Sequence, residues 1–117
     1  MTDELNAVFT YGTLRPSKEA THTIYCHEMY DYGRFPYLIK SDGNAESVKG
    51  NLIYVTDEQL EQLDHYEGVE RGLYTREDVL AFPIDSEGVT PGTQCFVYVA
   101  TDRLHPKRIS SGDWFQR

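Results

Sequence analysis

Short runs of alternating or continuous apolar residues dominate the chain and predict β-strands at residues 7–11, 48–55, 73–82 and 93–100. The first run is rich in β-branched and aromatic residues and stops at Gly12, which indicates a strand followed by a turn. Residues 73–82 alternate between two sets of side chains, as a long strand with two distinct faces does. Residues 93–100 are apolar without alternation, which is typical of a strand buried on both faces.

The segments between these strands carry weaker or turn-like patterns. Residues 35–39 form a short β-like run that contains Pro36, so they predict an edge strand or a bulge. Residues 41–44 read Ser-Asp-Gly-Asn and predict a turn, and residues 83–92 predict a hairpin loop. Residues 17–32 place apolar side chains near helical spacing but are polar and β-branched in places, so the type of element there stays open.

One helix is clearly marked near the middle of the chain. Thr56 is a predicted N-cap, and Gln59 three residues later completes a capping box. The helix is expected to run to about Tyr66 or Glu67 and to end at Gly68, which can take the left-handed C-cap conformation. Strands with a single helix among them exclude a Rossmann-type βαβ alternation. They predict a compact α+β fold, for which closure into a small barrel is one way to remove exposed strand edges.

Length and charge limit the organisation and the partners of the protein. The 117 residues fit one domain over residues 1–117 and leave little room for a second core. The net charge of −8 argues against nucleic acid as a partner and against anionic membranes, because both require a basic surface. A small anionic substrate stays compatible with this charge, since a local group of backbone N–H donors can outweigh a distant acidic field.

The sequence also indicates a cytoplasmic protein. No run approaches the roughly 20 apolar residues that cross a bilayer, and the acidic first residues lack the pattern of a signal peptide. Cys26 and Cys95 are too few for a disulfide framework, and we expect both to be reduced and to pack as small apolar side chains. The histidines show no zinc-binding spacing, so we expect no metal.

Glu67 is the strongest candidate for chemistry. On the predicted helix Leu60 and Leu63 mark the apolar face, and Glu67 falls between them at 3.6 residues per turn. A carboxylate on that face points toward the core, where burial raises its pKa or requires a partner. A glutamate tuned in this way suits general acid/base work. The alternative is that the helix frays before Glu67 and the side chain turns to solvent.

A second candidate site is the turn after the first strand. A glycine at position 12 lets the backbone turn sharply and can direct successive N–H groups into one concavity that holds a carboxylate. Arg15 is expected to add a positive charge nearby. The alternative is an ordinary turn that only ends the strand.

Three sequence blocks together resemble one known family. Val8 to Arg15 reads VFTYGTLR and resembles the YGSL or YGTL signature of the γ-glutamyl cyclotransferase-like (AIG2-like) family. LDHYEG at residues 63–68, followed by LYTR at 73–76, is similar to that family's LDxxEG and Y-x-R block. SGDW at 111–114 is similar to the GDW near the end of many bacterial members. Their order along almost the whole chain makes the resemblance specific.

This resemblance implies a fold and a set of site residues. The fold would be a small closed mixed β-barrel of about five to six strands with one main helix packed beside it. The family's catalytic glutamate falls on Glu67, and a ligand-contacting tyrosine falls on Tyr74. Its substrate-cradling turn falls on Tyr11, Gly12, Thr13 and Leu14. Strand alternation places Arg76 on the face of Tyr74, either as a supporting partner of the site or as a surface arginine.

The implied reaction is the release of 5-oxoproline from a γ-glutamyl amine or peptide by attack of the substrate's own α-amine, without a cofactor. The protein would act on this small substrate as a monomer or weak homodimer. Two other functions stay open: a non-catalytic module that binds a small carboxylate in the same pocket, and an interaction domain with a tyrosine-rich surface. The chain departs from the family pattern between Leu14 and Val48, a region expected to shape the part of the pocket that holds the leaving group.

Overall fold

A closed five-stranded barrel forms the centre of the fold. Around the barrel the strands follow the order β1 (Asn6–Thr10), β5 (Ser47–Val55), β2 (His22–Tyr25), β6 (Tyr74–Pro83) and β7 (Thr93–Ala100). The computed structural model describes residues 5–12, 14–31, 35–41, 46–84, 91–101 and 107–116. Of the expected loops, residues 42–44 and 85–90 therefore lie outside the described part of the chain.

The barrel is mixed because β1 and β7 close it in parallel, with Val8 opposite Phe96, while its other neighbouring strands pair antiparallel. The closed mixed barrel with one main helix confirms the fold expected from the family resemblance. Strand β7 is buried on both faces, as its continuous apolar sequence predicts: Val97 faces the interior of the barrel and Tyr98 the helix side.

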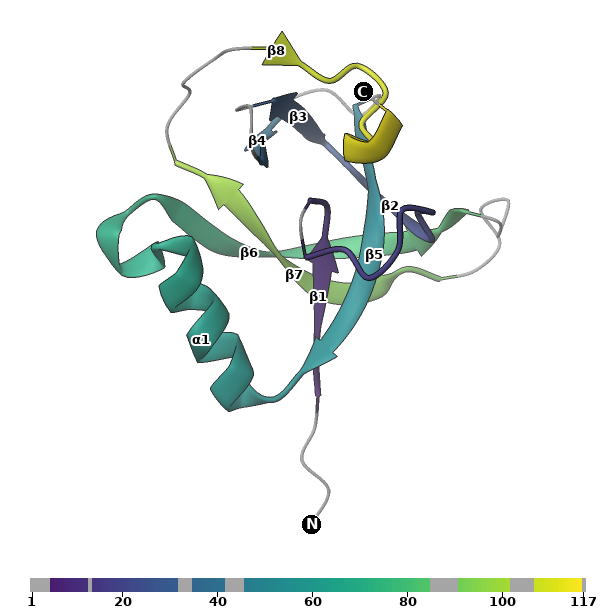
Figure 1. The fold of residues 1–117 in the computed structure, drawn as a ribbon. Helices are drawn as coiled ribbons and strands as arrows, with labels where there is room; N and C mark the ends of the chain where they lie inside the picture. The colour runs from purple at the N-terminus through teal and green to yellow at the C-terminus, as the bar shows by residue number, and fades with distance from the viewer. Residues whose placement is uncertain are drawn as a thin grey trace.

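A second sheet of three strands covers one end of the barrel, away from the N-terminus (Figure 1). Its order is β4 (Pro36–Lys40), β3 (His27–Asp31) and β8 (Lys107–Arg108). Strand β4 is an edge strand that begins at Pro36, which confirms the interpretation of residues 35–39 as an edge strand.

The segment whose type stayed open, residues 17–32, contains two strands that belong to different sheets. Between them Cys26 takes a left-handed backbone conformation with φ 66°. Its amide donates to the Glu46 carbonyl at 2.8 Å, and its carbonyl accepts from the Ser41 amide at 2.8 Å. The local spacing of apolar residues did not reveal these strands, because β2 is held by pairing with distant partners in β5 and β6.

The helix α1 (Asp57–Glu67) packs beside the barrel (Figure 1) and has the predicted ends. The Gln59 amide donates to Thr56 Oγ1 at 3.2 Å, and the Thr56 amide donates to Gln59 Oε1 at 2.9 Å, so the capping box is complete. Gly68 ends the helix at φ 72°, a conformation that is strained for residues with a Cβ. A short 3₁₀ turn, η1 (Val69–Arg71), then leads into β6. No helix in the described residues is long and apolar enough to span a membrane.

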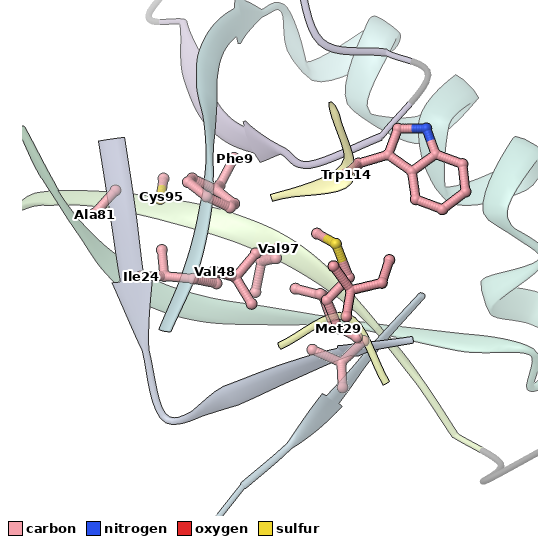
Figure 2. Close-up of a cluster of buried hydrophobic side chains, with 11 residues drawn as sticks. Phe9, Ile24, Met29, Val48, Ala81, Cys95, Val97 and Trp114 are labelled. Carbon is pink, nitrogen blue, oxygen red and sulfur yellow. The ribbon is translucent and has the colours of Figure 1, made fainter. Parts of the chain in front are cut away.

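Two apolar clusters hold the barrel, the second sheet and the helix together. The larger cluster fills the barrel and continues to Met29 of β3 and to Trp114 of the 3₁₀ turn η3 (Trp114–Gln116) (Figure 2). The smaller cluster joins Leu60 of α1 to Val8 and Tyr98 on the outer barrel wall. Because successive side chains of a strand point to opposite faces, the neighbours Val8 and Phe9 in β1 belong to different clusters. The smaller cluster holds α1, and therefore its last residue, against the outer wall of the barrel.

Candidate active site

A cavity of about 390 Å³ opens where β1 ends. Its wall is assembled from five parts of the chain: β1 and the turn after it, the start of β4, the last turn of α1, the start of β6, and β7. All the site residues that the sequence predicts and the structure describes lie in this wall, namely Tyr11, Gly12, Leu14, Glu67 and Tyr74. Thr13 lies outside the described residues.

Glu67 is the last residue of α1 and is half-buried in the cavity wall. Leu60, one of the two leucines on the expected apolar face, is buried, and Leu63 packs against the same cluster. The helix does not fray before Glu67, so its carboxyl group faces the cavity instead of bulk solvent. Burial raises the Glu67 pKa above its ordinary value of 4.5. A carboxyl group with this shift can accept and return a proton closer to neutral pH.

Tyr11 and Tyr74 lie in the same wall as Glu67. The Tyr11 hydroxyl donates to the backbone carbonyl of Tyr98 at 2.7 Å, which leaves its oxygen lone pairs as acceptors. Burial raises the Tyr11 pKa well above its ordinary value, and the nearby Tyr74 and Glu67 raise it further. Tyr11 is therefore a neutral phenol at physiological pH, and Tyr74 and Glu67 are close enough to influence its protonation.

The glycine of the signature turn is required because Pro36 packs directly against it in the cavity wall. A Cβ on Gly12 would lie 2.7 Å from both Cδ and Cγ of Pro36, at the start of β4. Contacts of that length do not occur between carbon atoms, so a larger residue would push the turn and β4 apart. The turn itself is closed by a hydrogen bond from the Arg15 amide to the Gly12 carbonyl at 3.0 Å.

Arg15 does not supply positive charge to the cavity, and the expectation that it would is wrong. Its side chain is fully buried and forms a 2.7 Å ion pair with Asp113, from the GDW block. The same guanidinium donates to Asn51 Oδ1 at 2.8 Å and to the Lys18 carbonyl at 2.9 Å. The buried Asp113 carboxylate offers a stronger partner than a solvated turn, so Arg15 ties the turn to the end of the chain.

The Arg76 side chain is 30% exposed and paired, in contrast to a free surface arginine. It forms a 2.7 Å ion pair with Asp64 Oδ2 and lies 4.9 Å from the centre of the Phe96 ring. The other Asp64 oxygen accepts from the Tyr98 hydroxyl at 2.7 Å. Both oxygens of Asp64 thus connect α1 to the barrel, one turn before Glu67.

Asp64 and Tyr98 are the site-supporting residues that the sequence reasoning missed. Asp64 lies within the quoted LDHYEG block, three positions before Glu67, and this helical spacing was the available signal. Tyr98 gave no signal, because its part in the site depends on strand β7 pairing with β1 and packing against α1. Among the described residues, no group of three His, Cys, Asp or Glu side chains could hold a metal ion.

Comparison with a known protein family covers nearly the whole chain. Residues 8–116 match the sequence pattern of the family described as gamma-glutamyl cyclotransferase, AIG2-like. The chain belongs to this family. The match includes the signature turn, the helix block and the closing GDW. A search of curated proteins found no significant match to the chain.

Solved structures of similar proteins agree on the fold of this AIG2-like chain. An uncharacterised protein from Pyrococcus horikoshii is 24% identical with a TM-score of 0.66, over 95% of this chain and 91% of that one. An AIG2-like protein from Mus musculus is 21% identical with a TM-score of 0.64, over 84% of this chain and 78% of that one. A protein named gamma-glutamyl cyclotransferase is 18% identical with a TM-score of 0.59, over 92% and 70%. At these identities the likeness concerns the fold alone.

Proposed function

We propose that this protein is a γ-glutamyl cyclotransferase-type enzyme that releases 5-oxoproline from a γ-glutamyl amide, with Glu67 as its general acid/base. One observation carries the proposal. A half-buried carboxyl group with a raised pKa lies in the wall of a cavity that also contains the family's signature turn. Perturbed carboxyl groups in cavities are frequent at catalytic sites.

The reaction needs a base and an acid at different moments. Glu67 takes a proton from the substrate's α-ammonium group, and the freed amine attacks the γ-carbonyl carbon to close a five-membered ring. As the tetrahedral intermediate collapses, the bond between the γ-carbon and the leaving nitrogen breaks, and Glu67 returns its proton to that nitrogen. The ring nitrogen gives up its second proton to solvent as the lactam forms, and the released amine takes up one proton from solvent to leave as an ammonium ion. The carboxyl group is regenerated as a carboxylate, so no cofactor is consumed.

The remaining cavity residues act by holding the substrate in a folded conformation. The attacking and attacked atoms belong to one molecule, and correct intramolecular placement can supply roughly 7–11 kcal/mol of the barrier. The turn at Tyr11, Gly12, Thr13 and Leu14 would receive the α-carboxylate through its backbone N–H groups. The Tyr11 oxygen, whose hydrogen is already donated to Tyr98, would accept from the α-ammonium group. Tyr74 would contact the γ-glutamyl part from the same cavity wall.

The decisive experiment measures 5-oxoproline by mass spectrometry after incubation with γ-glutamyl compounds. We expect the wild type to release it from at least one of them, and Glu67→Gln to lower kcat by about 10²–10⁴-fold while the fold is kept. Glu61→Gln is the matched control, because Glu61 is exposed on the same helix and lies outside the cavity. A Glu67→Gln variant with most of its activity would exclude Glu67 from the mechanism.

Thermal unfolding with and without 5-oxoproline, together with this assay, separates the enzyme from a binding module. A folded wild type that is stabilised by 5-oxoproline but turns over no γ-glutamyl compound would be a small-carboxylate-binding protein. That outcome would overturn the proposed reaction and leave the fold assignment untouched.

A further inference from the structure

The mouth of the cavity carries exposed apolar side chains. Leu14, Phe35, Tyr66 and Leu73 line the cavity and are 41%, 43%, 69% and 51% exposed. We call these four residues the apolar collar. They come from four separate segments: the signature turn, the residue before β4, the last turn of α1 and the residue before β6. Exposed apolar side chains that gather around one cavity mark a surface that binds apolar material.

The collar lies next to the proposed catalytic group. Tyr66 precedes Glu67 in the chain. The Leu73 side chain packs against Gly68, the residue after Glu67. A Cβ added to Gly68 would lie 2.8 Å from Leu73 Cδ1. Tyr66 and Leu73 are therefore the collar residues nearest to Glu67 along the chain and over its helix end.

Among the described residues, the cavity lining offers no cationic partner for a negatively charged leaving group. Of its described lining residues, Glu67 has the only carboxyl group, and none is a lysine, arginine or histidine. Arg15 and Arg76, the two arginines of the family blocks, are held by Asp113 and Asp64. The net charge of −8 adds a repulsive field for a second carboxylate. A carboxylate laid on the collar would lose part of its water without gaining a cationic partner among the described lining residues.

The size of the cavity also favours a small, uncharged leaving group. Its volume of about 390 Å³ is near the lower end of the range of roughly 300–1,000 Å³ for small-molecule sites. Such a volume suits a γ-glutamyl group with a short substituent better than a tripeptide. Phe35 and Pro36 belong to the region between Leu14 and Val48 that departs from the family pattern, so this chain's own sequence builds that side of the mouth.

We infer that the preferred substrates are γ-glutamyl amides of small apolar amines, aliphatic or aromatic, whose hydrocarbon part lies on the apolar collar during reaction. This inference rests on the proposed cyclotransferase function. It excludes glutathione, γ-glutamyl amino acids and γ-glutamyl-ε-lysine as preferred substrates, because each carries a charged group beyond the scissile amide.

The test compares kcat/KM for γ-glutamyl-isopentylamide and γ-glutamyl-phenethylamide with that for γ-glutamyl-methylamide, which has the same reacting groups and almost no hydrocarbon tail. We expect the wild type to prefer the larger apolar amides by at least about ten-fold, and to turn over glutathione, γ-glutamyl-alanine and γ-glutamyl-ε-lysine more slowly than either. Burial of the additional methylene groups against the collar is the physical reason.

Variants of the collar test its role directly. We expect Leu73→Ser and, independently, Leu14→Ser to lower the ratio of kcat/KM for isopentylamide to that for methylamide by about ten-fold. The control is Leu80→Ser, because Leu80 is 49% exposed, lies on β6 after Leu73 and does not line the cavity; it should keep the wild-type ratio. Thermal unfolding of each variant verifies its fold.

The outcomes separate this inference from the proposed function. Turnover of the methylamide without a preference for the apolar amides, or collar variants with an unchanged ratio, would overturn the substrate inference alone. Faster turnover of a charged substrate would overturn it as well. Absence of 5-oxoproline from every compound, the methylamide included, would overturn the proposed function and the substrate inference with it.

Discussion

The buried ion pair between Arg15 and Asp113 provides the sharpest test of how this fold holds its signature turn. The two side chains are 0% and 9% exposed, and the guanidinium also donates to Asn51 and to the Lys18 carbonyl. Removing one partner of such a pair costs about 3–5 kcal/mol, because the other charge is left uncompensated in a medium that solvates it poorly.

Asp113→Asn is the cleanest perturbation, since asparagine keeps the shape and one acceptor oxygen but removes the charge. We therefore expect the lower end of that range, about 3 kcal/mol. This is a large part of the total stability of a domain, which is about 5–15 kcal/mol. At about 4 °C per kcal/mol for a chain of this size, the Tm should fall by about 12 °C.

Urea unfolding followed by tryptophan fluorescence suits this measurement. The chain has one tryptophan, Trp114, which is 5% exposed and adjacent to Asp113. The control is Lys40→Gln, which removes an exposed pair: Lys40 lies 3.6 Å from Glu77 and its side chain is 69% exposed. That change should cost less than about 1 kcal/mol.

Two results would refute the reasoning about this pair. One is an Asp113→Asn protein within about 1 kcal/mol of the wild type, which would mean that water or another group compensates Arg15. The other concerns the double variant Arg15→Met with Asp113→Leu. We expect it to be more stable than Asp113→Asn, because no charge is left buried, although Asn51 Oδ1 still loses its donor. A double variant less stable than Asp113→Asn would contradict this.

Three further changes test other parts of the site. Because burial raises the Glu67 pKa, the folded protein binds that proton more tightly than the unfolded chain, and the ionised carboxylate destabilises the fold as pH rises through the folded pKa. Glu67→Gln should therefore have a higher Tm than wild type at pH 7–8, with the gap closing below the ordinary value of 4.5; an equal Tm throughout would show that burial costs nothing. Gly12→Ala should lose about 1–3 kcal/mol in thermal unfolding and more than ten-fold in kcat/KM, because its Cβ meets the Pro36 ring at 2.7 Å; wild-type values of both would contradict the close approach. Arg76→Gln should lower kcat more than it raises KM, since it frees Asp64 and the helix end that carries Glu67, and Arg76→Lys should restore part of kcat; a change in stability alone would leave Arg76 with a purely structural role.

The sequence by itself determined the features that depend on neighbouring residues. The helix begins at its capping box and ends at Gly68, as predicted, because both signals act over three or four residues. Strand β7 was found from its apolar run, and the position of Glu67 on the apolar side of α1 followed from helical periodicity.

Only the tertiary structure decided the features that join distant parts of the chain. The division of residues 17–32 between two sheets, the parallel closure of β1 on β7 and the cavity itself depend on pairings that no local pattern encodes. Arg15 shows the physical reason most clearly. By its position in the sequence it belongs to the signature turn, yet it binds Asp113, 98 residues away, because a buried carboxylate outweighs a nearby solvated site as a partner for a guanidinium group.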